Sequence, residues 1–307
     1  MNDKFSDHWS EWLLYRRYGG DAQTERRVRT DTEKYADRVL DGAGLAPGMT
    51  LADIGTGDGL IAFRAIERIG PSLKVLMTDI SLPLLDHAKA RAAERGIDRQ
   101  CVFLEGSADA LAGIDDGSVD VIATRAVLAY VADKPAALRE FYRVLRPGGR
   151  LSICEPIMRD EALEVCALRK IVEAQRERGD VQDPFPELLL RWRSAQYPDT
   201  EEQVWATPIT NYDERDLVRY AIGAGFSGVY LEFHIDMQTL ETTSWDALLQ
   251  SSPHPLAPSL DAVLANQFTP DERRVFEAKV RGVLENGSNV LGMNRIAWMT
   301  AEKPGAA

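Results

Sequence analysis

The sequence predicts an α/β fold in which a doubly wound sheet is covered by helices on both faces. An apolar run, 49–54, leads into three alternating glycines and then into a helical stretch, 60–69. A second apolar run, 73–78, ends at an acidic residue about 20 residues beyond those glycines, as doubly wound sheets often have it. Short apolar runs and amphipathic stretches then alternate as far as residue 237.

Composition limits the classes of partner and compartment. The 307 residues suffice for a core domain with helical additions. The formal net charge of −12 argues against nucleic acids and anionic membranes, because basic surfaces recognise both. Cys101, Cys154 and Cys166 lie far apart without C-x-x-C spacing, so we expect reduced thiols, a cytoplasmic location and no metal site. We expect neither a signal peptide nor a membrane span.

The turn after the first apolar run indicates a cofactor site. Gly55, Gly57 and Gly59 alternate shortly after Asp53. Glycine tolerates left-handed backbone angles and leaves room for a ligand where a Cβ would stand. Amides at the start of the following helix point at whatever lies over the turn. A dinucleotide fingerprint needs its third glycine where Leu60 stands, and an acid at Asp53 would repel a pyrophosphate but attract an ammonium or sulfonium group.

The acid and the three glycines together resemble motif I of the class I S-adenosylmethionine-dependent methyltransferases, (D/E)-x-G-x-G-x-G. The junction 143–151, R-V-L-R-P-G-G-R-L, is similar to that of small-molecule methyltransferases of the ubiquinone/menaquinone type (methyltransferase type 11). This resemblance implies a Rossmann-like, seven-stranded sheet that binds S-adenosyl-L-methionine and releases S-adenosyl-L-homocysteine. It covers 50–155 specifically, and 213–237 and 290–303 loosely.

The resemblance also implies which residues contact the cofactor. Asp79 is expected to bind both ribose hydroxyls, the alternative being the N-cap of the next helix, which Ser81 can also supply. The loop after the third strand is expected to frame the adenine through Ala108 and either Ser107 or Asp109. The expected cofactor-binding residues are Asp53, Gly55, Thr56, Gly57, Gly59, Asp79, Ile80, Ser107, Ala108, Asp109 and Arg125.

The remaining elements follow from the periods of their apolar residues. Further strands are expected at 101–104, 118–124, 151–154, 229–237 and 290–299, and further helices at 24–40, 82–95, 135–145 and 213–223. The expected parts are a helical N-terminal lid (1–46), an S-adenosylmethionine-binding core (47–156), a helical insertion (157–210) and the C-terminal part of the sheet (211–307) with a second helical insertion (240–288). The second insertion is expected to hold a proline-broken loop and one or two helices. Insertions on a fixed scaffold are expected to build the substrate pocket.

Candidate catalytic residues follow the fourth and fifth strands. Glu155 is expected as a base or as the partner of a cationic substrate group, with a helix cap or a structural ion pair as the alternative. Arg125 is expected to bind a substrate carboxylate, or else to form a salt bridge with Asp133 or Glu155. Tyr130 is the third candidate, with packing as the alternative. Phenols, carbon acids and ammonium groups need a base, whereas thioethers and carboxylates do not.

The aromatic N-terminal segment is interpreted either as a lid over the site or as core packing. Trp9, Trp12 and Arg16 fall on one face of a helix. A lid would bring Tyr and Arg side chains to the cofactor carboxylate or to the substrate. The expected substrate-binding residues are Trp9, Trp12, Tyr15, Arg16 and His254, the last of which lies in the proline-broken loop.

We therefore expect a methyltransferase for a small-molecule acceptor, by O-, C-, N- or S-methylation. Glu155 beside Arg125 would suit a methionine-like thioether amino acid, whereas Trp9, Trp12 and Trp205 would suit a phenol, a quinone or a prenyl acceptor. Two other classes stay open, an NAD(P)-dependent oxidoreductase and a non-catalytic cofactor binder. The expected partner is a small molecule, without nucleic acid or membrane, and a homodimer remains an open alternative.

Overall fold

Seven strands form one sheet in the order β3-β2-β1-β4-β5-β7-β6 in a computed structural model that describes residues 7–179, 183–239, 244–285 and 291–305. The strands are β1 (Thr50–Ile54), β2 (Lys74–Asp79), β3 (Cys101–Glu105), β4 (Val119–Arg125), β5 (Leu145–Pro156), β6 (Ser227–Thr239) and β7 (Leu291–Glu302). Neighbours from β3 to β5 pair in parallel, and β7 is antiparallel to both β5 and β6. The predicted doubly wound α/β class is therefore confirmed.

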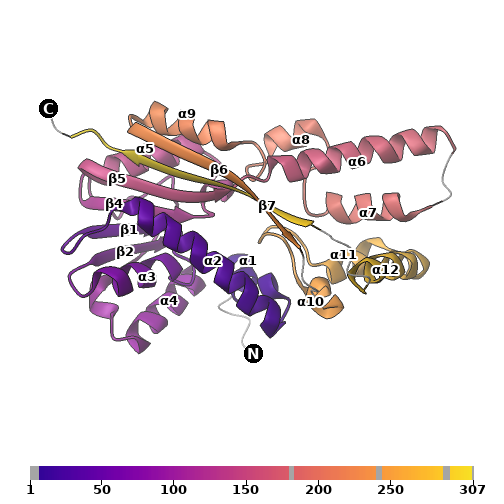
Figure 1. The fold of residues 1–307 in the computed structure, drawn as a ribbon, viewed down its shortest axis with the longest axis horizontal. Coiled ribbons are helices and arrows are strands. Elements are labelled where there is room, and N and C mark those ends of the chain that lie inside the picture. Colours follow the sequence, from indigo (N-terminus) through magenta and orange to yellow (C-terminus); the bar gives the residue numbers. More distant parts are fainter. Residues whose placement is uncertain (1–6, 180–182, 240–243, 286–290, 306–307) are drawn as a thin grey trace.

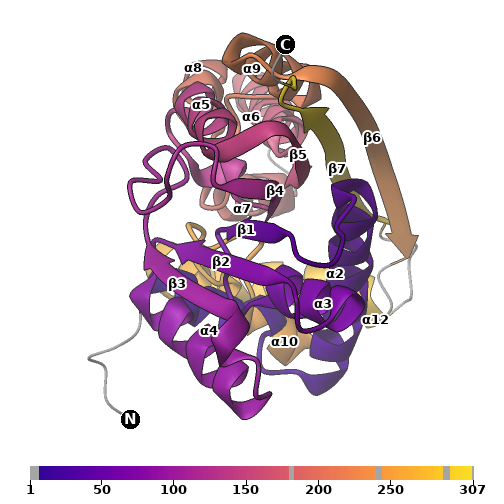
Figure 2. The same cartoon turned by 90° about the vertical axis from the view of Figure 1, so that its left-hand side faces the viewer.

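Helices cover both faces of this sheet (Figure 2). One face carries α2 (Ala22–Ala43), α3 (Leu60–Ile69) and α4 (Leu82–Glu94), and the other carries α5 (Lys134–Val144) and α9 (Glu214–Ala224). Each helix turns an apolar stripe to the sheet. Two separate clusters of buried side chains result, one around Phe63 and one around Phe141. Strand β5 begins at Leu145 rather than at residue 151, because Leu145 already pairs with Val119 of β4.

Two helical insertions extend beyond the carboxyl ends of the parallel strands (Figure 1). The first consists of α6 (Arg159–Glu177), α7 (Phe185–Ser194) and α8 (Glu201–Ala206). The second contains α10 (Trp245–Gln250), α11 (Leu260–Gln267) and α12 (Pro270–Glu285), which makes three helices instead of the expected one or two. The additional helix, α10, is a short one whose N-terminus is capped by Ser244, just ahead of the proline-broken loop.

The N-terminal segment is helical, as expected, but it is interrupted. Helix α1 (His8–Leu14) is followed by a short 3₁₀ turn, η1 (Arg16–Tyr18), and then by α2. Gly19 and Gly20 both have positive φ and separate this turn from α2. In the described part of the chain, no helix is both long and apolar enough to cross a membrane.

Buried polar contacts join the first insertion to the core. The ammonium of Lys134, 2% exposed, donates hydrogen bonds to the carbonyls of Val131 and Pro208 and to the side chain of Asn211. Its burial lowers the pKa of Lys134 to about 8. The fully buried Tyr212 donates its hydroxyl to the carbonyl of Pro156 at 2.6 Å. The end of β5 is thereby tied to the segment that returns from the insertion.

We expect Tyr212→Phe to lower the free energy of unfolding by about 1–3 kcal/mol, because the carbonyl of Pro156 loses its buried donor. Urea unfolding followed by intrinsic fluorescence measures the loss. Tyr230→Phe is the matched control, since Tyr230 is 63% exposed on β6. Equal stabilities of the two variants would show that this bond does not hold the insertion.

Candidate functional site

A cavity of about 530 Å³ opens where the parallel strands end. This volume lies within the range of about 300–1,000 Å³ that small-molecule sites occupy. Its walls come from the residues after β1 to β5, from β7, from α1 and from the proline-broken loop. The carboxyl edge of an open α/β sheet is the usual place for a ligand. Among the described residues, no group of His, Cys, Asp or Glu side chains is arranged to hold a metal ion.

The glycine turn forms one wall of this cavity. Gly57 has a φ of +56°, and a Cβ added there would lie 2.9 Å from the Cδ2 atom of Leu13 on α1. Helix α1 therefore rests directly on the turn. The N–H of Gly57 donates to Oδ2 of Asp79 at 2.9 Å. Gly59 does not line the cavity; it caps α3 at a φ of +83°, against the ring of Phe63.

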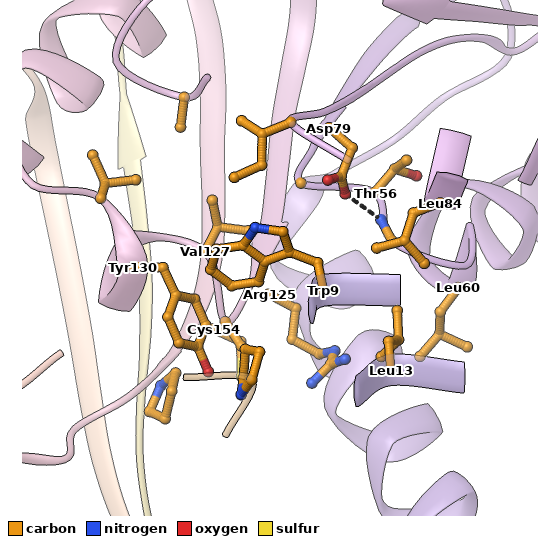
Figure 3. A pocket seen from close by; sticks show the side chains of 18 of the residues that line it. Trp9, Leu13, Thr56, Leu60, Asp79, Leu84, Arg125, Val127, Tyr130 and Cys154 are labelled. Carbon is orange, nitrogen blue, oxygen red and sulfur yellow. Dashed lines mark hydrogen bonds between the residues drawn. The ribbon is translucent and has the colours of Figure 1, made fainter. Parts of the chain in front are cut away.

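Asp79 lines the cavity, and the cap of α4 is Ser81 instead. Oδ1 of Asp79 accepts the N–H of Ser81 at 2.9 Å, while the hydroxyl of Ser81 caps α4 by accepting the N–H of Leu84. Each oxygen of Asp79 has accepted one amide and retains capacity for another donor. Burial raises the pKa of Asp79, and the N–H groups of Ser81 and Gly57 oppose that rise. Figure 3 shows Asp79 beside Thr56 at the wall of the cavity.

Asp53 joins the end of β1 to the start of α3. Its Oδ2 accepts the hydroxyl of Thr56 at 2.7 Å and the N–H of Ala62 at 3.1 Å. Asp53 is 1% exposed and lines the cavity. Burial raises its pKa to about 7, and the negative charges of Asp79 and Asp58 act in the same direction.

The loop after β3 supplies a further wall. Gly106, Ser107, Ala108 and Asp109 all line the cavity, and the hydroxyl of Ser107 bonds the carboxylate of Asp109. Ile80, 50% exposed, lines it from the end of β2. The structure therefore brings every expected cofactor-binding residue except Gly59 to one cavity.

Glu155 does not reach the cavity wall. It is fully buried, and its carboxylate accepts the N–H groups of Val127 and Ala129 and the hydroxyl of Thr124 at 3.0–3.2 Å. Burial raises its pKa, and these donors oppose the rise. Its carboxylate thus binds the loop after β4 and is not exposed to the cavity. The suggested pair of Glu155 and Arg125 on a zwitterionic acceptor is therefore not assembled.

Arg125, Tyr130 and Trp9 all line the cavity (Figure 3). The rings of Trp9 and Tyr130 meet edge to face, with centroids 5.1 Å apart. Burial raises the pKa of Tyr130 well above its usual range, so its hydroxyl stays protonated. Neither suggested salt bridge of Arg125 is present: Asp133 pairs with Arg139, and Glu155 bonds the loop.

The N-terminal segment lines the cavity through Trp9 and Trp12, as expected, but not through Tyr15 or Arg16. Arg16 forms an ion pair with Glu11 at 3.4 Å outside the cavity, and Tyr15 is 67% exposed. Both expectations for substrate contacts are wrong, because α1 ends at Leu14 and the 3₁₀ turn changes the direction of the next side chains. Arg17 lines the cavity instead, with its guanidinium 5.2 Å from the ring centroid of Trp12. The only sequence signal for Arg17 was its place in the aromatic segment.

Two further expectations for the acceptor pocket fail. His254 is 2% exposed, bonds the carbonyl of Gln196 at 2.8 Å and does not line the cavity, although its neighbours Pro253 and Pro255 do. Trp205 is 57% exposed and lies under the guanidinium of Arg159, away from the site. Trp12 does reach the cavity, and its Nε1 donates to the carbonyl of Ser252 at 3.0 Å. The lid is thereby attached to the proline-broken loop.

Comparison with protein families and curated proteins gives consistent matches. The model of a family described as "Methyltransferase domain" matches residues 45–204, just over half of the chain. A nocamycin O-methyltransferase from Saccharothrix syringae is 36% identical over 143 residues, which are 45% of this chain and 50% of that protein. A ubiquinone/menaquinone biosynthesis C-methyltransferase from Hahella chejuensis is 35% identical over 117 residues, 38% of this chain and 47% of that protein. The chain thus spans about half the length of the curated relatives it matches.

Solved structures share the fold at low sequence identity. The YcgJ protein of Bacillus subtilis superposes with a TM-score of 0.55 at 15% identity, over 88% of this chain and 98% of that chain. A phosphoethanolamine N-methyltransferase 2 from Haemonchus contortus, solved in complex with S-adenosyl-L-methionine, superposes with a TM-score of 0.50 at 15% identity, over 88% of this chain and 52% of that chain. At this identity the likeness concerns the fold alone.

We expect the free energy of unfolding of the wild-type protein without ligand to fall, relative to Asp53→Asn, as pH rises from about 4 to about 7. The folded-state pKa of Asp53 lies near 7 and its usual value is 3.8. The neutral carboxyl is therefore favoured by folding, and this contribution is complete below the unfolded-state pKa and lost as pH rises through the folded-state pKa.

Denaturant unfolding of both proteins between pH 4 and pH 8 measures the effect. Asp86→Asn, which changes an exposed aspartate on α4, should run parallel to the wild type. A difference between the wild type and Asp53→Asn that stays constant over this range would contradict the raised pKa of Asp53.

Proposed function

This chain belongs to the methyltransferase-domain family, and we propose that it transfers the methyl group of S-adenosylmethionine to a small-molecule acceptor. The observation that carries the proposal is the carboxylate of Asp79, which anchors the glycine turn through the N–H of Gly57 and faces the cavity. The turn and the carboxylate come from adjacent strands, β1 and β2. The family match favours the methyl donor over a dinucleotide.

The residues present fit the chemistry of this cofactor. Gly55 and Gly57 line the cavity with positive φ, and a Cβ at either position would meet the side chain of Val127 or Leu13, so the turn can pass this close to the cavity only with glycine. A ribose offers two hydroxyl donors, and Asp79 has two oxygens with capacity left. An ammonium group and a sulfonium group carry positive charge, which the acids at the ends of β1 and β2 favour.

We assign the cofactor moieties to successive strand ends. Asp79 holds the ribose, Ser107 to Asp109 together with Ile80 surround the adenine, and Asp53 and Thr56 lie toward the amino-acid end. The bound cofactor supplies a methyl group on a positively charged sulfur. The task of the chain is then to hold an acceptor atom in line with that methyl group while the lid excludes water.

The acceptor space lies between the cofactor residues and the lid. Trp9, Val127 and Tyr130 give it an apolar wall. No histidine lines the cavity in the described part of the chain, and Glu155 is withdrawn into the loop behind it. We infer that proximity and orientation supply most of the rate enhancement, without a dedicated histidine or glutamate base.

Incubation with a methyl-labelled donor and a small-molecule extract tests the proposed function. Label should move into an extract component, and its transfer should depend on active protein. A protein that binds the donor in a 1:1 ratio but labels nothing in any extract would be a non-catalytic binder, and the proposal would be wrong.

We expect Asp79→Ala to weaken the binding of S-adenosylmethionine and of S-adenosylhomocysteine equally, by roughly 10- to 100-fold. The reason is that hydrogen bonds to a charged group contribute about 1.5–3 kcal/mol. Asp79→Asn retains an acceptor oxygen and should therefore reduce both affinities by a smaller factor. Calorimetric titration measures both affinities, with Asp86→Ala on the exposed face of α4 as the control. If the Asp79→Ala protein bound both compounds as tightly as the control, Asp79 would not be part of the cofactor site.

A further inference from the structure

The cavity has two chemically different halves. All four carboxylates that line it in the described chain stand in or beside the ends of β1, β2 and β3, namely Asp53, Asp58, Asp79 and Asp109. The other half comes from the ends of β4 and β5, from β7, from α1 and from the proline-broken loop. Its described lining is mainly apolar and includes Trp9, Val127 and Ile296, with Arg125 as its cation.

Two guanidinium groups line the cavity without an ion-pair partner. Among the described residues, no carboxylate lies within ion-pair distance of Arg17 or Arg125, whereas Arg159 and Arg295 each bind two or more carboxylates. Burial, followed by the positive charge of Arg125, lowers the pKa of Arg17 to about 10. Two like charges that share a partly dry cavity are costly unless a ligand supplies anions.

The cofactor supplies only one carboxylate, and Arg17 is the better placed of the two to bind it. Arg17 follows α1, whose Leu13 rests on the Gly57 turn, and the negative charge of Asp58 acts on it. Arg125 instead ends β4 and is in register with Cys154 of β5, on the side away from β2 and β3. Its side chain lines the same cavity as those of Trp9 and Tyr130 (Figure 3).

We propose that Arg125 binds a carboxylate group of the methyl acceptor, so that the acceptor is a small organic acid with an apolar or aromatic body. The proposal rests on the proposed function and names its substrate class. A planar guanidinium binds a carboxylate through two parallel hydrogen bonds. The rings of Trp9 and Tyr130, which meet edge to face in the same cavity, provide an apolar surface for the rest of the acceptor.

Binding of 1-naphthoate and of 1-naphthamide to the protein saturated with S-adenosylhomocysteine tests this assignment by calorimetry. The two probes have the same ring system and differ in charge. The wild type should bind the acid roughly 10- to 100-fold more tightly than the amide. Arg125→Gln should abolish this preference while S-adenosylhomocysteine still binds, and Arg125→Lys should restore part of it.

Two matched variants separate the roles of the neighbouring arginines. Arg17→Gln should weaken the binding of S-adenosylhomocysteine more than the binding of 1-naphthoate. Arg16→Gln, which removes an ion pair outside the cavity, should change neither affinity.

A wild type that binds the acid no more tightly than the amide, or that binds neither, overturns the assignment of Arg125. A preference for the acid that survives in Arg125→Gln also overturns it. Failure of the wild type to bind S-adenosylhomocysteine is a different result, because it contradicts the proposed function and not the acceptor class alone.

Discussion

The buried carboxylate of Glu155 binds the loop after β4, at the edge of the sheet on which the candidate site is built. A carboxylate without donors would be costly at this depth, and the loop after β4 supplies the N–H groups of Val127 and Ala129. The loop directs these N–H groups at Glu155 after a sharp turn at Ala126, a non-glycine residue with a φ of +56°. That turn sets Arg125 and Tyr130 at the cavity wall. Glu155 does not line the cavity, and we propose that it sets the position of the acceptor half through this loop.

The charged side chains of the cavity are also arranged along the carboxyl edge of the sheet. Carboxylates gather after β1 to β3, where the proposed cofactor offers hydroxyl, ammonium and sulfonium groups. Guanidinium groups stand at the lid and at the end of β4, where carboxylates of the two ligands would meet them. Helix α1 closes over both halves, since Leu13 contacts the glycine turn and Trp12 bonds the carbonyl of Ser252. In the proposed function, α1 would therefore cover both the cofactor and the acceptor.

The sequence sufficed for the sheet and for most of the cavity wall after β1 to β3, because both depend on local patterns. The conformation of the glycine turn and the position of the acid at the end of β2 depend on a few consecutive residues. Each strand is likewise indicated by one short apolar run. The acceptor side depends on long-range packing. No local pattern indicates that the side chain of Glu155 turns inward or that His254 packs away from the cavity. Nor does one indicate that α1 ends at Leu14, so that Arg17 rather than Arg16 lines the cavity. These positions are set by contacts between segments far apart in the chain.

The central claim is that the turn and carboxylate formed by β1 and β2 bind an adenosyl amino acid. Calorimetric titration of the purified protein with S-adenosylmethionine, S-adenosylhomocysteine and NAD⁺ tests it most directly. The account predicts that both sulfur compounds bind at one site per chain and that NAD⁺ binds far more weakly. Binding of NAD⁺ in preference to both sulfur compounds would contradict it.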